Sequence, residues 1–209
     1  MLGAEPGVTL NFAVTWDYRC PFARNAHEHI LTGLAAGADW QVDFVPFSLG
    51  QIHVQEGEPS VWEKPEQDTG ILALQTGVVV RDDYPDVFPA VHRALFALRH
   101  DLGRHLESRD AIAGTLADHA LDAEQVFARV DSGDALRRIR TEHERSVDSS
   151  EVWGVPTFIA RGQAVFVRLM NRSTMGADPD QSIRAVERIV DLLVGWPDLN
   201  EFKHTTLPR

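Results

Sequence analysis

Residues 9–22 read TLNFAVTWDYRCPF, and this stretch decides the fold. Residues 9–16 alternate apolar and polar side chains and then become mostly apolar, which predicts a buried strand. A short polar turn follows, and we expect a helix to begin at Cys20 and Pro21, because proline suits the first helical position. The stretch therefore predicts a strand, a turn and a helix, with the only cysteine of the chain at the turn.

The residues that follow complete a first structural unit. An apolar stripe at helical spacing predicts a helix that Gly37 can end. The stripe consists of Phe22, Ala26, Ile30 and Leu34. Residues 40–49 alternate again, and Pro46 suggests a bulge or the end of a strand. The first fifty residues thus predict a β-α-β unit with a right-handed crossover between parallel strands.

The middle of the chain has a different pattern. Residues 52–81 show only weak periodicity and contain loop signals. Residues 86–150 are almost wholly helical in pattern, with several apolar stripes and one charged run that we interpret as a solvated helix face. Near the end, residues 156–160 and 164–169 predict a β-hairpin, and Asp178 is expected to cap a final helix.

This order predicts an α/β domain that carries an all-helical insertion. We expect residues 8–52 and 151–209 to form the α/β domain and residues 53–150 to form the inserted helical domain. With 209 residues and 44% hydrophobic side chains, the chain is large enough to bury such a core.

Charge and cysteine content limit the classes of function. A net charge of −11 opposes non-specific binding to nucleic acid or to an anionic membrane, so neither is expected as a partner. Residues 1–6 lack the features of a signal peptide, and no apolar run is long enough for a spanning helix. One cysteine cannot form an internal disulfide, which favours a reducing compartment, and we expect a cytoplasmic protein.

Cys20 is the first candidate for chemistry. At a helix N-terminus, unpaired N–H groups and the helix dipole stabilise an anion, so the pKa of a thiol there can be lowered. Arg19 and Arg24 flank it, and either could add favourable charge. The alternative is that Cys20 is a small buried apolar residue without a chemical role.

Two motifs resemble a known family. Residues 17–22 (Asp-Tyr-Arg-Cys-Pro-Phe) are similar to the active-site turn of DsbA-like thioredoxin-fold proteins. Residues 154–158 (Gly-Val-Pro-Thr-Phe) are similar to the loop that carries the family's cis-proline. The group includes FrnE-like oxidoreductases, kappa-class glutathione transferases and 2-hydroxychromene-2-carboxylate isomerases. The resemblance implies a thioredoxin-like fold with an inserted all-helical domain, and a cleft between the Cys20 turn and the Pro156 loop.

The chain departs from the dithiol members at one position. They carry Cys-x-x-Cys, whereas this chain has Ala23 where the second cysteine would stand. The resemblance therefore implies a thiol-dependent oxidoreductase that works through a monothiol cycle, with Cys20 as nucleophile. A small thiol such as glutathione or mycothiol would be the co-substrate that releases Cys20, and no tightly bound cofactor is expected. The expected substrate-binding residues are Pro21, Phe22, Trp153, Val155 and Pro156.

Two other functions remain open. The first is an isomerase or transferase that uses a small thiol as cofactor, although those relatives generally place serine where Cys20 stands. The second is a non-catalytic binding protein that kept the fold and lost the dithiol. A homodimer is possible under any of these functions.

The histidines do not indicate a metal site. The chain has nine, but no two are four residues apart, and the only cysteine lies elsewhere. We therefore expect no metal and expect most of the histidines to lie at the surface or to cap helices. His27 is about two helical turns from Cys20 and is not expected to act as its base.

Overall fold

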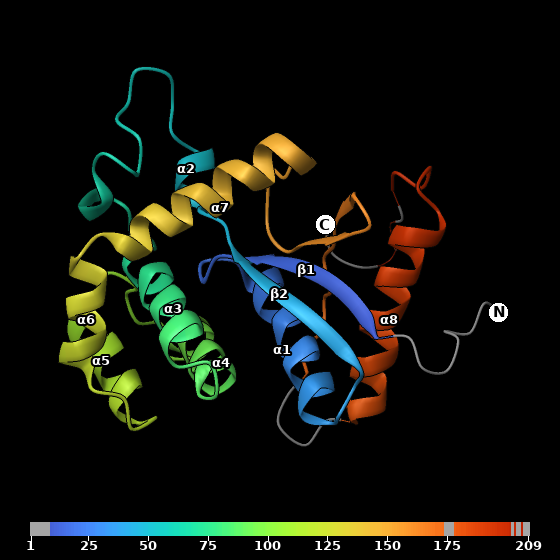
Figure 1. Cartoon of the computed structure of the whole chain (residues 1–209), viewed down its shortest axis with the longest axis horizontal. Coiled ribbons are helices and arrows are strands. Elements are labelled where there is room, and N and C mark those ends of the chain that lie inside the picture. Colours follow the sequence, from blue (N-terminus) through green and yellow to red (C-terminus); the bar gives the residue numbers. More distant parts are fainter. Residues whose placement is uncertain (1–8, 174–177, 202, 204–205, 207–209) are drawn as a thin grey trace.

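The computed structural model describes residues 9–173, 178–201, 203 and 206. Its sheet has four strands in the order β2-β1-β3-β4, and the helices cluster at one end and along the sheet (Figure 1). Residues 1–6, from which the absence of a signal peptide was predicted, lie outside the described residues, as does His204.

The predicted β-α-β unit is confirmed. Strand β1 spans Leu10–Trp16, helix α1 spans Pro21–Ala35, and strand β2 spans Trp40–Pro46. The two strands pair in parallel, from Leu10 opposite Trp40 to Trp16 opposite Pro46. Because parallel strands need a crossover, α1 connects them, and Figure 1 shows it lying along the sheet.

The predicted hairpin and final helix are also present. Strand β3 (Thr157–Ala160) pairs antiparallel with β4 (Gln163–Phe166), and β3 also pairs with the central strand β1. Asp178 caps helix α8 (Pro179–Gly195) by accepting a hydrogen bond from the Asp180 N–H. Helices α1 and α8 pack together, so the first and last helices of the chain are neighbours in the fold.

The helices between β2 and β3 form a separate group at one end of the sheet (Figure 1). Their bounds are α2 Leu49–Ile52, the 3-10 turn η1 Pro65–Gln67, α3 Ile71–Asp83, α4 Phe88–His100, α5 Arg109–Ala117, α6 Ala123–Asp131 and α7 Asp134–Ser150. Helix α7 runs from this group back to the sheet, where it contacts β2. The chain thus has an α/β fold with a group of helices inserted between β2 and β3. The domain boundaries predicted at residues 52 and 150 stay a prediction.

Helix α3 was not expected from the sequence. It lies in the region of weak periodicity, and nine of its residues, from Ile71 to Val80, are buried. A helix that is buried on nearly all sides has no polar face, so it shows no amphipathic period. Three consecutive valines and Gly77 also lower its intrinsic helix propensity. Contacts with α4, α6 and α7 hold it in the helical conformation.

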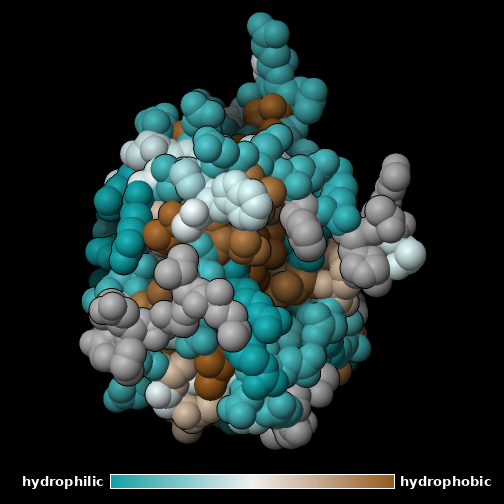
Figure 2. All heavy atoms as spheres, turned by 90° about the vertical axis from the view of Figure 1, so that its right-hand side faces the viewer, coloured by the Kyte–Doolittle hydropathy of each residue, from teal (hydrophilic) through white to brown (hydrophobic). Residues whose placement is uncertain are grey.

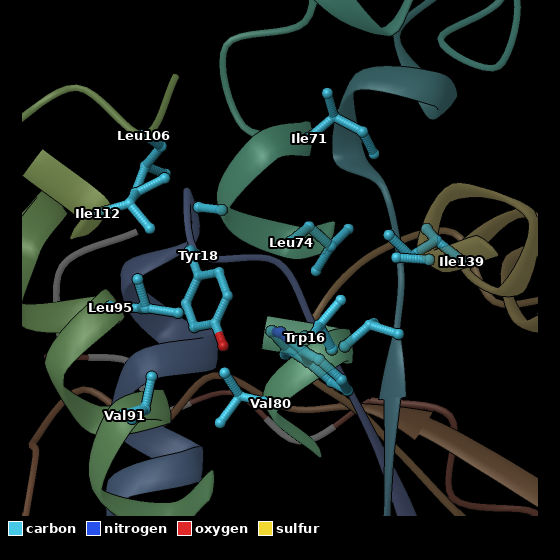
Figure 3. Close-up of a cluster of buried hydrophobic side chains, with 14 of the residues drawn as sticks. Trp16, Tyr18, Ile71, Leu74, Val80, Val91, Leu95, Leu106, Ile112 and Ile139 are labelled. Carbon is cyan, nitrogen blue, oxygen red and sulfur yellow. The ribbon is translucent and has the colours of Figure 1, made fainter. Parts of the chain in front are cut away.

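Buried apolar residues form two clusters. One lies between the sheet, α1 and α8 and includes Val14, Ile30 and Val186. The other fills the helical group and receives Trp16 and Tyr18 from the end of β1 and the turn after it. Figure 3 shows these two rings among side chains of the inserted helices. The turn before Cys20 is therefore fixed by aromatic residues that the helical group encloses.

The surface is mostly hydrophilic with scattered apolar patches. Figure 2 shows one side of the molecule, where hydrophobic side chains gather in the middle of a largely polar face. Across the described residues, the exposed large apolar side chains include Trp153, Met170, Leu192 and Trp196. No helix in the described part of the chain is long and apolar enough to cross a membrane.

Candidate functional site

Cys20 caps the N-terminus of α1 through its side chain. Its Sγ accepts a hydrogen bond from the Ala23 N–H at 3.4 Å, which is the bond that a serine or aspartate cap usually makes. The thiol also donates to the carbonyl oxygen of Val155, 3.2 Å away. Cys20 thus joins the start of α1 to the loop before β3.

A buried carboxylate fixes the turn before Cys20. Asp17 is fully buried and accepts hydrogen bonds from the backbone N–H groups of Arg19 and Leu49, each at 2.9 Å. The Arg19 guanidinium pairs with Asp17 at 2.6 Å and with Asp68 at 2.9 Å. A side chain at Gly70 would overlap the Arg19 guanidinium, so that position needs glycine for close approach. The turn is therefore held by one ionic contact with Asp68 and by one hydrogen bond from the backbone of Leu49.

The two arginines that flank Cys20 do not supply it with free charge. Arg19 is committed to Asp17 and Asp68, and Arg24 pairs with Glu28 and Asp101. Burial raises the pKa of the Cys20 thiol, and the N–H groups of Ala23 and Phe22 and the charge of Arg168 lower it only in part. The expectation that the helix N-terminus leaves Cys20 with a lowered pKa is therefore wrong for this state. Near pH 7 Cys20 is a neutral thiol that donates a hydrogen bond to the Val155 carbonyl.

The Pro156 loop lies directly against the Cys20 turn. The peptide bond between Val155 and Pro156 is cis, and both residues are buried. Thr15 of β1 fixes the loop, since its hydroxyl accepts the Thr157 N–H at 2.9 Å and donates to the Gly154 carbonyl at 3.4 Å. The sequence predicted a cleft between turn and loop, but the two are joined by the thiol hydrogen bond.

The five predicted substrate-binding residues differ in exposure. Pro21 is exposed and Phe22 half-buried, and Trp153 is 62% exposed. Val155 and Pro156 are buried, so only their backbone atoms are suited to contact a substrate. The structure brings Phe22, Val155 and Pro156 to Cys20.

Two residues at the site were missed. The guanidinium carbon of Arg168 lies 5.2 Å from the ring centroid of Phe22 and 5.5 Å from that of Phe166. Phe166 in turn contacts Trp153, with ring centroids 4.5 Å apart. Phe166 and Arg168 are two residues apart at the end of the predicted hairpin. Side chains two residues apart in a strand lie on the same face of the sheet, so this spacing could have placed the two together.

The sequence predicts that most of the nine histidines lie at the surface or cap helices, and four are exceptions. His27, His29, His92 and His143 are buried. Packing of α1 against α4 encloses His27 and His92 in a hydrogen-bonded chain with Tyr18, whereas His29 lies against Ser182 of α8 and His143 against Phe47. The Tyr18 hydroxyl lies 2.7 Å from His92 Nδ1, and His92 Nε2 lies 2.9 Å from His27 Nδ1.

One arrangement of protons satisfies this chain with neutral groups. His27 Nε2 lies 3.2 Å from the Thr15 carbonyl oxygen, which can only accept, so Nε2 carries the proton. His92 Nε2 then donates to His27, and Tyr18 donates to His92 Nδ1. Burial lowers the pKa of His27 to about 4 and that of His92 well below its ordinary value. None of these atoms is bonded to Cys20 Sγ, as expected for His27.

Two hollows of the surface lie away from Cys20. One of about 420 Å³ is lined by α3, α6 and α7, and one of about 530 Å³ lies between α7 and the sheet. Neither is lined by Cys20 or by the Pro156 loop. Within the described residues, no three histidine, cysteine, aspartate or glutamate side chains are grouped as metal ligands would be.

The sequence matches the family described as DSBA-like thioredoxin domain over residues 13–179. The structure is similar to oxidoreductase DsbA from Xylella fastidiosa, with a TM-score of 0.57 and 16% identity over 90% of this chain and 88% of that chain. DsbA from Pseudomonas aeruginosa also has a TM-score of 0.57, at 18% identity over 90% of this chain and 85% of the other.

A 2-hydroxychromene-2-carboxylate isomerase reaches a TM-score of 0.60 at 12% identity, with 92% of this chain and 100% of the isomerase covered. At these identities the likeness shows a shared fold only. No protein of curated function matches the chain. Because the family match covers most of its length and its structure has the same architecture, the chain belongs to the DSBA-like thioredoxin domain family, with the thioredoxin-like α/β fold.

Proposed function

We propose that the protein is a thiol-dependent oxidoreductase of the DsbA-like group that acts through its single cysteine, Cys20. The observation that carries the proposal is the contact of the Cys20 thiol with the Val155 carbonyl, 3.2 Å away, beside the cis-proline. The family match supports a reaction at a thiol. Ala23 leaves Cys20 without a resolving thiol, so the partner sulfur must come from a substrate or co-substrate.

The proposed reaction is a thiol–disulfide exchange between a mixed disulfide and a small thiol, in which Cys20 carries one half of the disulfide between the two. Cys20 loses its proton to solvent, and the thiolate attacks one sulfur of a mixed disulfide, so that the S–S bond breaks and the other half leaves as a thiolate. A small thiol such as glutathione or mycothiol then attacks the Cys20 mixed disulfide as its thiolate. It forms a new disulfide with the bound half and releases Cys20 as a thiolate. Overall, the half that leaves first is reduced to a thiol and the small thiol is oxidised to a disulfide, so two electrons pass from the small thiol to the substrate.

The local geometry favours the thiolate at the moment of reaction. The N–H groups of Phe22 and Ala23 are directed at the Cys20 sulfur and support negative charge on it. In the resting state the raised pKa keeps the proton on sulfur. The rate of reaction with a disulfide is therefore expected to go on rising with pH above about 8.5, the pKa of a free cysteine.

The test is the reaction of Cys20 with a mixed disulfide of glutathione, followed by mass spectrometry of the adduct and by turnover with free glutathione. Wild type is expected to form one adduct at Cys20, and Cys20→Ser and Cys20→Ala are both expected to lose all turnover. Circular dichroism checks that the variants fold. Full turnover by Cys20→Ser would refute the proposal.

A specific observation favours a second candidate, an isomerase or transferase that uses a small thiol as cofactor. The neutral Cys20 thiol is a hydrogen-bond donor at a helix N-terminus, as a serine would be there. This function predicts that Cys20→Ser binds glutathione as well as wild type in calorimetry, whereas Cys20→Ala binds it more weakly. It also predicts that no mixed disulfide accumulates on Cys20.

A further inference from the structure

Arg168 differs from the other arginines around the Cys20 turn. Arg19, Arg24 and Arg172 are each paired with carboxylates. Arg168 is exposed, and among the described residues no carboxylate lies within ion-pair distance of it. Its guanidinium instead lies against the rings of Phe22 and Phe166. Aromatic faces orient a cation without neutralising its charge, so Arg168 keeps its capacity to pair with an anion.

The charge of Arg168 acts on the reacting sulfur. Arg168 lies close enough to Cys20 to lower the pKa of the thiol, although burial, the largest cause, leaves that pKa raised overall. Phe22, which supports the guanidinium, also supplies one of the two N–H groups directed at the sulfur. Phe22 of α1 therefore contacts both the Arg168 guanidinium, through its ring, and the Cys20 sulfur, through its backbone N–H.

Two aromatic side chains continue the surface from Arg168. Phe166 lies under the guanidinium, and Trp153 contacts Phe166 with 62% of its own surface exposed. An exposed tryptophan beside a reactive group is a surface on which a planar or apolar group can stack. We call this surface the ledge. It runs from the Cys20 turn to the Pro156 loop and consists of Phe22, Arg168, Phe166 and Trp153.

We propose that Arg168 makes Cys20 selective for thiols and disulfides that carry an anionic group, such as a carboxylate or sulfonate, with Trp153 and Phe166 receiving a planar part of the same molecule. The proposal rests on the proposed reaction of Cys20 with disulfides. An anion gains a full ion pair with Arg168 because it displaces no carboxylate. A cationic substrate meets repulsion at the same point, so the residue discriminates in both directions.

The experiment compares two aromatic disulfides that differ in charge. Dithiobis(nitrobenzoate) is dianionic and dithiodipyridine is neutral near pH 7.5, and both release a coloured thiol when a cysteine attacks them. The ratio of their second-order rate constants cancels changes in the fraction of thiolate, which removal of Arg168 also alters. Rates are measured at low and high ionic strength on the native protein.

Arg168→Gln is expected to lower the ratio of the anionic to the neutral rate constant about two- to five-fold at low salt, the effect of losing one exposed ion pair. High salt is expected to shrink this difference. Arg168→Lys keeps the charge and is expected to retain most of the ratio. Arg188→Gln removes an exposed arginine of α8 that has no ion pair among the described residues, and it is expected to leave the ratio unchanged.

Two other outcomes are distinguishable. If Cys20 reacts with both reagents and Arg168→Gln leaves the ratio as in wild type, the selectivity proposal is refuted and the proposed reaction stands. If Cys20 in the folded protein reacts with neither reagent at any pH up to 9.5, the proposed reaction fails and the selectivity falls with it.

Discussion

The turn that follows β1 lies between two regions that differ in whether their polar side chains have partners within the protein. On one side is the buried Tyr18–His92–His27 chain, and on the other is the surface around Cys20 and Arg168. Tyr18 points inward and its hydroxyl begins a buried chain through His92 and His27, in which every ring nitrogen has a partner. Cys20, two residues later, faces the ledge that ends at Trp153, where Arg168 has no carboxylate partner among the described residues. Paired polar groups stabilise the fold, whereas unpaired ones are available to a ligand, so the second region is where binding is expected.

Acid is expected to affect the buried region most. His27 has a folded-state pKa of about 4, below the unfolded value of about 6.5, so the unfolded chain binds more protons between these values. The contribution of His27 to the free energy of unfolding is therefore fully present above pH 6.5. It is lost as the pH decreases towards 4, a change of about 3 kcal/mol. Urea unfolding at pH 7 and pH 4.5 measures the loss. Equal midpoints at the two pH values would show that the histidines are solvated.

Removing one member of the chain is expected to cost about 1–3 kcal/mol. His92→Phe keeps a ring of similar size but leaves the Tyr18 hydroxyl and His27 Nδ1 buried without their partner. The double variant with Tyr18→Phe removes the stranded hydroxyl and is expected to recover part of the loss. Denaturant midpoints of the two single variants and the double variant give the coupling energy. Strict additivity would argue that the two groups do not interact.

A matched pair of glycines tests the packing around Tyr18. A side chain at Gly77 in α3 would overlap the Tyr18 hydroxyl, whereas one at Gly114 in α5 meets nothing within 4 Å. Gly77→Ala is expected to destabilise the protein by about 1–2 kcal/mol through overpacking, after the gain in helix propensity. Gly114→Ala is expected to stabilise it by about 0.5–1 kcal/mol. The two thermal midpoints should move in opposite directions, and a shift of equal sign would contradict the close packing of Gly77 against Tyr18.

The smallest change is expected at the exposed end of the ledge. Trp153→Ala removes a ring that is 62% exposed and contacts Phe166, so the free energy of unfolding should change by no more than about 0.5 kcal/mol. Thermal unfolding beside His92→Phe makes the comparison direct. A loss as large as that of His92→Phe would assign Trp153 to the core instead of to the binding surface.

Local patterns in the sequence were sufficient for part of this structure. The strand, turn and helix around Cys20 follow from alternation and from Pro21, and the cap of α8 follows from Asp178. These features depend on residues that are close in sequence. Helix α3 was missed because periodicity reports an exposed face, and α3 has almost none.

The site was only partly predictable for a related reason. Arg168 is 148 positions from Cys20, and only the pairing of β3 with β1 brings the end of the hairpin to the turn. The buried histidines were misjudged because histidine has no fixed burial preference, and a partner such as Tyr18 for His92 lies 74 residues away. The carboxylate partners of Arg19 and Arg24 are also distant in sequence, since Asp68 lies 49 residues from Arg19 and Asp101 lies 77 residues from Arg24.

The bond between Cys20 and Val155 has a consequence for the order of events during synthesis. These residues are 135 positions apart, and the central strand β1 acquires its partner β3 only when residues 158 and 159 are available. A growing chain can form β1, α1 and β2 early, because those contacts are local. Val155, whose carbonyl accepts the hydrogen bond from the thiol, and Arg168 are translated only after the whole helical group. Until then Cys20 is an ordinary cysteine on a partly folded chain, and a ribosome-bound fragment that ends before residue 155 should show the alkylation rate of a free thiol.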